Sequence, residues 1–136
     1  MATMRLEIVT PEEKTFSDEI EGVVLPGSEG EMGVLPQHIP LMTKLMPGEL
    51  RLMKDGKESR LAVGEGFVEV TGDKVSVLTD MAIREGEIDE TAAEEAVRRA
   101  EEALKGEHMD AEEMATVEAS LQKSLAQLKV KRRRHH

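Results

Sequence analysis

The chain has 136 residues and a formal net charge of −10, with no cysteine and only two aromatic residues, Phe16 and Phe67. The lack of cysteine excludes disulfides, thiolate catalysis and cysteine-ligated zinc, and the scarcity of aromatic platforms argues against binding nucleic acid by base stacking. No apolar run approaches the roughly 18 residues of a membrane span, and no signal-peptide pattern opens the chain. We therefore expect a soluble protein of a bacterial cytoplasm.

The first part of the chain is predicted to be all-β. Short β-rich runs, separated by turn signals, cover 5–9, 20–25, 32–35, 50–53, 59–63, 67–70 and 75–78. Asp55-Gly56 and Thr71-Gly72-Asp73 predict hairpins, and the alternation over residues 4–8 predicts a strand with one buried face. Many short strands with local turns favour an antiparallel sandwich or flattened barrel over a parallel α/β fold.

The core of this β-structure has to be built from leucine, valine, isoleucine and the nine methionines. Four methionines within or beside the predicted strands are most simply interpreted as flexible core filler: Met42, Met46, Met53 and Met81. The alternative is an exposed surface of methionine and leucine that receives a partner.

Near residue 86 the hydrophobic period changes from strand-like to helical. One helix is expected to begin after the N-cap Asp89 and to stop at Gly106, and a second begins near Asp110. Their apolar stripes are Ala93, Ala96, Val97, Ala100, Ala103 and Leu104, and then Met114, Val117, Leu121, Leu125 and Leu128. We predict two domains, a β-sandwich over 1–86 and an antiparallel α-helical hairpin with a basic tail over 87–136, held loosely because the stripes are narrow.

The last eight residues form a basic tail on an acidic chain. The tail carries Lys129, Lys131, Arg132, Arg133 and Arg134. Its charge is +5, so the rest of the chain carries −15. Such a tail is either solvated or docks onto an acidic partner surface, and both interpretations stay open here.

No group of residues predicts catalysis or a metal site. His38 is isolated and is expected to hydrogen-bond a nearby carbonyl or carboxylate. Ser28 and Glu29 precede it without a nucleophile elbow, and the glycines around them do not match a phosphate loop. His108 belongs to a predicted solvated turn between the helices. We expect a protein that is not an enzyme and has no cofactor.

The segment 25–41 combines glycines at 27, 30 and 33 with prolines at 26, 36 and 40, which together fix the path of the backbone. Its sequence, LPGSEGEMGVLPQHIPL, resembles the pattern G-S-x-G-E-x-G-[IV]-L-P-x-H-x-P-L of the epsilon subunit of F-type ATP synthases. Further similar stretches lie in family order at 47–50, 64–70, 77–82 and 126–130. The resemblance therefore covers nearly the whole chain.

This resemblance implies a β-sandwich followed by two helices, bound to the gamma subunit of the central stalk and to the membrane rotor ring. It places Glu31 and His38 at the contact with the ring, although a carboxylate in a glycine-rich turn is most often simply solvated. The hairpin would extend towards the alpha and beta subunits of the catalytic head and inhibit ATP hydrolysis, with the basic tail meeting acidic loops there. The chain would lie peripherally at the cytoplasmic face of the bacterial inner membrane and touch it only through the complex.

In some family members a nucleotide stabilises the folded hairpin through the motif [IL]-D-x-x-R-A. The corresponding stretch here begins Ile88-Asp89 and has Ala92 where the arginine is expected. Asp89 and Arg99 remain as a possible weak nucleotide site, so we expect ATP to bind weakly or not at all. An alternative function of another class is a stand-alone adaptor whose basic tail binds an acidic protein or RNA.

Overall fold

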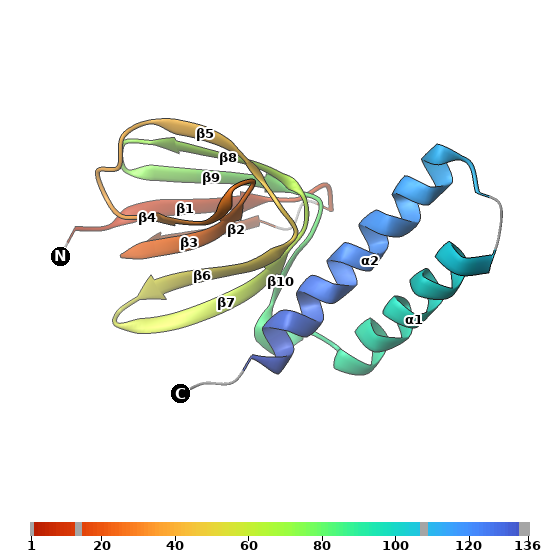
Figure 1. Cartoon of the computed structure of the whole chain (residues 1–136). Coiled ribbons are helices and arrows are strands. Elements are labelled where there is room, and N and C mark those ends of the chain that lie inside the picture. The colour runs from red at the N-terminus through yellow and green to blue at the C-terminus, as the bar shows by residue number, and fades with distance from the viewer. Residues whose placement is uncertain (1, 13–14, 107–108, 134–136) are drawn as a thin grey trace.

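The computed structural model describes residues 2–12, 15–106 and 109–133 as a β-barrel-like body carrying two helices (Figure 1). The strands are β1 (Met4–Val9), β2 (Thr15–Ile20), β3 (Gly22–Gly27), β4 (Gly30–Val34), β5 (Leu41–Leu45), β6 (Gly48–Lys54), β7 (Lys57–Val63), β8 (Gly66–Thr71), β9 (Lys74–Thr79) and β10 (Ala82–Arg84). A short 3-10 turn, η1 (Glu85–Glu87), leads into helices α1 (Glu90–Gly106) and α2 (Ala111–Arg132). The predicted fold class, an all-β sandwich or flattened barrel followed by a helical hairpin, is confirmed.

The strands form one sheet in the order β10-β7-β6-β3-β5-β8-β9-β1-β2, with β4 added beside β3. Neighbouring strands are antiparallel, as predicted, with the exception of the parallel pair β1 and β9. The two ends of the sheet meet through side chains. Arg84 of β10 lies over the ring of Phe16 of β2, with its guanidinium carbon 5.2 Å from the ring centroid, and Lys54 of β6 donates to Asp18 of β2 at 2.6 Å.

Alternation of apolar and polar residues places the core inside this curved sheet. In β1, Met4, Leu6 and Ile8 are almost fully buried, whereas Val9 at the end of the strand is 45% exposed. Each strand from β1 to β9 contributes at least one residue to the main apolar cluster, and these residues are leucine, valine, isoleucine and methionine. The core is therefore aliphatic, as the composition required.

The turn residues form the predicted hairpins. Asp55 and Gly56 both have positive φ, at 53° and 76°, and they join β6 to β7 as a two-residue loop in which Lys54 faces Lys57. Gly72, with φ 53°, lies between β8 and β9. Positive φ at both central positions matches the right-handed twist of the flanking strands.

Several strand and core predictions were wrong. The strands β2, β5 and β10 were not predicted, and the expected run 20–25 is divided at Glu21 between β2 and β3. Of the methionines expected in the core, only Met81 is buried, while Met42 is 68% exposed. Met53 on β6 faces outward like Met42 on β5, because a strand sends alternate side chains outward whatever their polarity, and Met46 lies exposed between β5 and β6.

Both helices begin at the predicted caps. The carboxylate of Asp89 accepts the backbone N–H of Ala92 at 3.0 Å, and Asp110 forms a reciprocal capping box with Glu113. α1 ends at Gly106, and all six residues of its predicted stripe are buried or half-buried. This stripe packs against α2.

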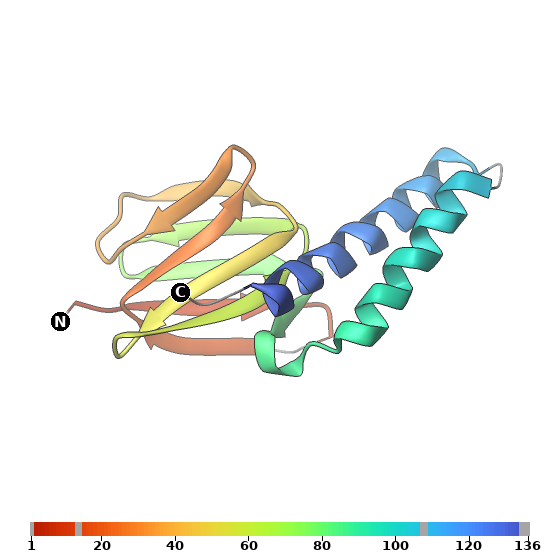
Figure 2. The ribbon, with the colours of Figure 1, turned by 60° about the horizontal axis from the view of Figure 1, so that its bottom comes forward.

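α2 has a second apolar face that its sequence pattern did not predict. Ala126 and Val130 are buried with Ala62, Met81 and Ile88 in a small cluster between the helix and the sandwich. Met114 and Leu125, placed on the predicted stripe, are instead exposed. Figure 2 shows that the C-terminal half of α2 lies against the body, while its N-terminal half and the paired part of α1 extend beyond it.

Candidate functional site

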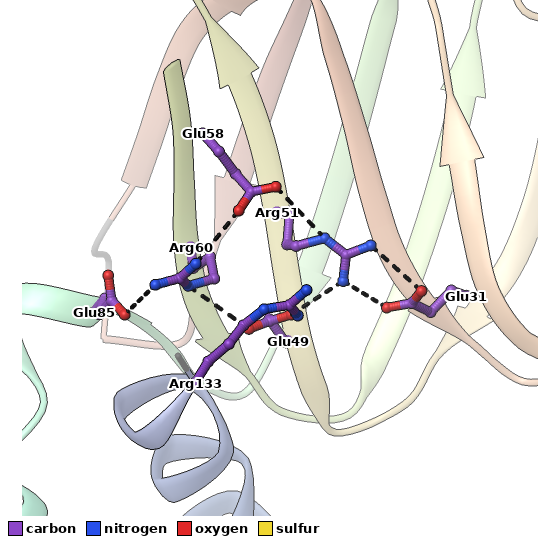
Figure 3. Close-up of polar contacts among 7 residues, drawn as sticks. All are labelled: Glu31, Glu49, Arg51, Glu58, Arg60, Glu85 and Arg133. Carbon is purple, nitrogen blue, oxygen red and sulfur yellow. Dashed lines mark hydrogen bonds and ion pairs between the residues drawn. The ribbon is translucent and has the colours of Figure 1, made fainter. Parts of the chain in front are cut away.

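A network of charged residues lies where the end of α2 meets the sandwich (Figure 3). Its members are Glu31, Glu49, Arg51, Glu58, Arg60, Glu85 and Arg133. Arg51 of β6 and Arg60 of β7 are direct cross-strand partners, which follows from the Asp55-Gly56 turn. Two like charges in this position repel each other, so the pair needs surrounding carboxylates.

Glu49 supplies the central carboxylate of this network and is 2% exposed. Arg51 donates to its Oε1 at 3.0 Å, and Nε of Arg60 lies 3.8 Å from its Oε2. Arg60 is itself 4% exposed and donates to Glu85 of η1 at 2.6 Å. A buried carboxylate is costly unless cations compensate it, and here two arginines of the sheet do so.

Glu31, on the edge strand β4, accepts from Arg51 at 2.7 Å while its side chain stays 57% exposed. The hydrogen bond from Arg51 lowers the pKa of the Glu31 carboxyl below its usual range, and the charges of Lys129 and Arg133 act in the same direction. Glu31 therefore belongs to the network and also presents an ionised carboxylate to solvent.

His38 lies in the segment between β4 and β5, where its Nδ1 is 2.7 Å from the carbonyl oxygen of Ile39. Within the described residues, no hydrogen bond or ion pair joins His38 to Glu31. The two expected ring-contact residues thus share the neighbourhood of β4 without forming one polar cluster.

The residues of the basic tail have different surroundings. Lys129 and Lys131 are exposed on the last turns of α2. Arg132 donates to Glu90 at 2.7 Å and to Glu94 at 2.5 Å, which ties α2 to α1, and Arg133 donates to Glu49 in the sandwich. Arg134 lies outside the described residues, as does His108.

The residues of the possible nucleotide site are not brought together. The Asp89 carboxylate caps α1, and Arg99 lies ten residues further along the same helix, which is about 15 Å of axial rise. Both are exposed. Asp89 and Arg99 therefore do not face one common ligand position.

An apolar row crosses the outer face of the sheet on β1, β9 and β8. Val9 pairs in register with Leu78, and Leu78 pairs with Phe67; Leu78 is 55% exposed and Phe67 60%. The sequence held a signal for this row, because Ile8-Val9, Val77-Leu78 and Phe67-Val68 are adjacent apolar pairs and a strand turns only one of each pair inward. Such a row of large apolar side chains is typical of an interaction surface.

Residues 2–12, 15–106 and 109–133 contain no cluster of three or more histidine, cysteine, aspartate or glutamate side chains arranged to hold a metal ion. In the same part of the chain, neither helix has the length and apolarity that crossing a membrane requires.

Comparison with known families covers both parts of this architecture. Residues 3–85 match the beta-sandwich domain of the ATP synthase delta/epsilon chain, and residues 87–132 match its long alpha-helix domain. The chain belongs to the ATP synthase delta/epsilon chain family. The resemblance drawn from segment 25–41 is thereby confirmed.

Similar members of the family are named ATP synthase epsilon chain. The protein of Dehalococcoides mccartyi is 47% identical over 137 residues, covering 99% of this chain and 98% of the relative. That of Pelotomaculum thermopropionicum is 52% identical over 102 residues, covering 75% of this chain and 76% of the relative. The stand-alone adaptor hypothesis gains no support from these relatives.

Two solved structures share the fold. A chain of the Euglena gracilis mitochondrial ATP synthase, in an assembly of OSCP, F1 and c-ring, superposes with a TM-score of 0.75 at 24% identity, covering 93% of this chain and 79% of that one. A chain of the Tetrahymena thermophila mitochondrial ATP synthase, from a central stalk and c-ring structure, gives 0.58 at 13% identity, covering 93% and 97%. At these identities the likeness establishes the fold.

Proposed function

We propose that this chain is a non-catalytic epsilon subunit in the central stalk of a bacterial F-type, proton-translocating ATP synthase. The observation that carries the proposal is the match of both domains, in order, to relatives named ATP synthase epsilon chain. The chain transmits rotation between the catalytic head and the membrane ring, and its hairpin inhibits ATP hydrolysis. It lies peripherally at the cytoplasmic face of the inner membrane, where contact with the membrane runs through the complex.

The apolar row of Val9, Leu78 and Phe67 is proposed as the surface for the gamma subunit. Its side chains lie on the outer face of the sheet, and burying them against a partner is favourable by about 25 cal/mol per Å² of apolar area. Phe67→Ser should weaken capture of purified gamma by at least tenfold. Met114→Ser, which removes an exposed apolar side chain from α2, is the control and should bind gamma normally. Equal binding by both variants would place the gamma surface elsewhere.

Glu31 and His38 are proposed to contact the rotor ring. Both lie near β4, which pairs with β3 and occupies an edge of the sheet. Glu31→Ala and His38→Ala should reduce ATP-driven proton pumping while unfolding at nearly the same denaturant concentration as the parent, since exposed substitutions usually cost within about 0.5 kcal/mol. Parallel losses of stability and pumping would assign these residues a purely structural role.

We propose that ATP does not stabilise the folded hairpin of this chain. Ala92 lacks the two directed donors of an arginine, and Asp89 is engaged as a helix cap. Calorimetric titration of the chain with ATP should give no saturable binding, whereas tight binding would contradict this view.

A further inference from the structure

Glu49 is a buried carboxylate at the face where the hairpin docks. It lies on β6 beneath the end of α2, is 2% exposed, and accepts from the guanidinium groups of Arg51 and Arg133. Of these two donors, only Arg133 comes from outside the sandwich. Removing Arg133 from the docked hairpin would leave the buried Glu49 carboxylate compensated only by the arginines of the sheet.

The charges around Glu49 favour the binding of a guanidinium group. The sandwich and η1 contribute four carboxylates to the network, Glu31, Glu49, Glu58 and Glu85, against two arginines, Arg51 and Arg60. Without the tail, this surface therefore has an excess of two negative charges. A guanidinium matches a carboxylate in shape, is always charged, and loses less hydration energy on burial than an ammonium does.

The position of Arg133 depends on the docking of α2. Arg133 is the C-cap residue that follows α2, and its backbone N–H donates to the carbonyl oxygen of Val130 at 3.4 Å. Val130 is fully buried in the small cluster that also contains Ala126, Ala62 and Met81. The guanidinium therefore meets Glu49 when this last turn of α2 lies on the sandwich.

We propose that Glu49 is a guanidinium-binding site for Arg133 of the same chain, and that this contact is a latch holding the helical hairpin on the sandwich. Helix α2 contributes only two apolar side chains, Ala126 and Val130, to the cluster beneath it, so a charge-assisted bond to a buried carboxylate adds substantially to what holds the hairpin. The latch is specific for arginine because lysine offers neither the planar fork nor the weaker hydration.

Arg51 extends the latch to the edge of the sheet, since it bonds Glu31 and Glu49 at once. If a cation from outside pairs with Glu31, Arg51 is free to interact with Glu49 alone. Glu49 is then better compensated within the sandwich, and its interaction with Arg133 becomes weaker. This extension rests on the proposed function, because it needs the ring to approach Glu31. It predicts that occupancy of the ring-facing edge favours release of the hairpin.

The latch can be tested on the full chain alone. Because the chain has no cysteine, Met42→Cys on β5 and Met114→Cys on α2 give two unique sites for spin labels. Pulsed electron paramagnetic resonance then gives the distribution of distances between hairpin and sandwich. Arg133→Ala should raise the undocked fraction about tenfold relative to the parent, and Arg133→Lys should recover only part of the docked state.

Lys131→Ala is the matched control, since it removes one positive charge two residues away on an exposed side chain. It should leave the distance distribution as it is. Equal effects of Lys131→Ala and Arg133→Ala would overturn the latch and leave only a general attraction between charges. Glu49→Gln removes the charge that the latch requires and should also raise the undocked fraction. Because Arg133 lies outside the sandwich, its variants decide the question even if Glu49→Gln fails to fold.

A second variant probes the shared arginine. Glu31→Gln removes a negative charge near Arg133, and it also removes the carboxylate that competes with Glu49 for Arg51. Both changes should increase the undocked fraction. No change would overturn the link between Glu31 and the latch. Hydrolysis is measured separately in the reconstituted complex, so an Arg133→Ala hairpin that undocks without changing hydrolysis would support the latch and contradict the proposed function.

Discussion

At the scale of single residues, Gly66 shows how closely two strands approach. A Cβ atom at this position would lie 1.8 Å from the carbonyl oxygen of Leu78 and 2.8 Å from Cα of Thr79, both backbone atoms of β9. Backbone atoms in a paired strand have little room to move. The glycine is therefore required by contact with β9, and its φ lies outside the left-handed region.

We predict that Gly66→Ala lowers the free energy of unfolding by at least about 2 kcal/mol, because overpacking in a closed sheet forces backbone shifts. Gly33→Ala is the control, since a Cβ there meets no atom within 4 Å, and it should change stability by less than about 0.5 kcal/mol. Urea unfolding of both variants measures the difference. A tolerated Gly66→Ala would mean that β8 and β9 are less tightly paired than described.

The Asp18 and Lys54 pair should make the closure of the sheet depend on pH. The hydrogen bond from Lys54 lowers the pKa of Asp18 below its usual 3.8, and the same bond raises the pKa of Lys54 above its usual 10.5. A lowered carboxyl pKa adds stability above the unfolded value, which is lost as the pH falls through the folded value. A raised lysine pKa adds stability below the unfolded value, which is lost as the pH rises through the folded one.

Asp18→Asn should therefore lower the midpoint of thermal unfolding at about pH 7, and its effect should shrink as the pH falls below the usual carboxyl pKa and through the lower folded-state pKa of Asp18. Nuclear magnetic resonance titration of Lys54→Ala should show the pKa of Asp18 moving up towards 3.8. Lys57→Ala, on the facing strand, is the control and should leave that pKa low. An unchanged pKa in Lys54→Ala would disprove the pairing.

Part of the candidate site could be predicted from the sequence at this scale. The Asp55-Gly56 turn fixes the register of β6 and β7, so the turn residues alone are enough to place Arg51 opposite Arg60. The contact of Arg133 with Glu49 could not be predicted, because it joins residues 84 apart whose approach depends on how α2 docks. Burial of Glu49 also had no local signal, since glutamate in a strand usually faces solvent.

At the scale of elements, whether a helix or strand could be predicted depends on how many of its faces are buried. The stripe of α1 faces a single neighbour, so its spacing of three and four was predicted correctly. α2 lies between α1 and the sandwich and uses two faces, which blurs its periodicity. β2 and β10 are edge strands, and β5 buries only Leu45 fully, so their sequences carry little of the strand pattern.

The N-terminal half of α2 extends beyond the sandwich, so its stability should depend strongly on its cap (Figure 2). Asp110→Ala removes the carboxylate that accepts the backbone N–H of Glu113 and should cost about 1 kcal/mol of local stability. Amide hydrogen exchange should accelerate in the first turns of α2 and remain slow near Val130. Asp110→Asn keeps a capping oxygen and should exchange almost like the parent. Uniform acceleration along α2 would show that the helix opens as one unit.

At the scale of the whole molecule, the sandwich has a core of its own. The main apolar cluster draws on β1 to β9, while the small cluster with Ala126 and Val130 lies on the outside of the sheet. A chain ending at Glu87 should therefore unfold cooperatively and keep its strand content, as measured by circular dichroism. Its midpoint of thermal unfolding should be lower, because Ala62 and Met81 are no longer buried by α2. An unfolded fragment would mean that the hairpin is needed to complete the sandwich.

The two parts of the molecule thus differ in how firmly they are built. The strands are joined by a continuous hydrogen-bonded sheet. The hairpin has fewer contacts with it, which include a small cluster containing Ala126 and Val130, the bond from Gln127 to Sδ of Met81, the Glu49 contact and the pair of Lys123 with Asp80 at 3.8 Å. A rigid body with a releasable appendage suits a subunit that stays bound to a rotor while its helices change position. This division is the physical basis of the proposed inhibition.

The most direct test of the proposed function is ATP hydrolysis by the catalytic complex reconstituted with either the full chain or the chain ending at Glu87. Both forms should bind gamma equally, because the apolar row lies entirely in the sandwich. We predict that hydrolysis is severalfold faster with the shortened chain. Equal rates, with both forms fully incorporated, would contradict the claim that the helical hairpin controls hydrolysis.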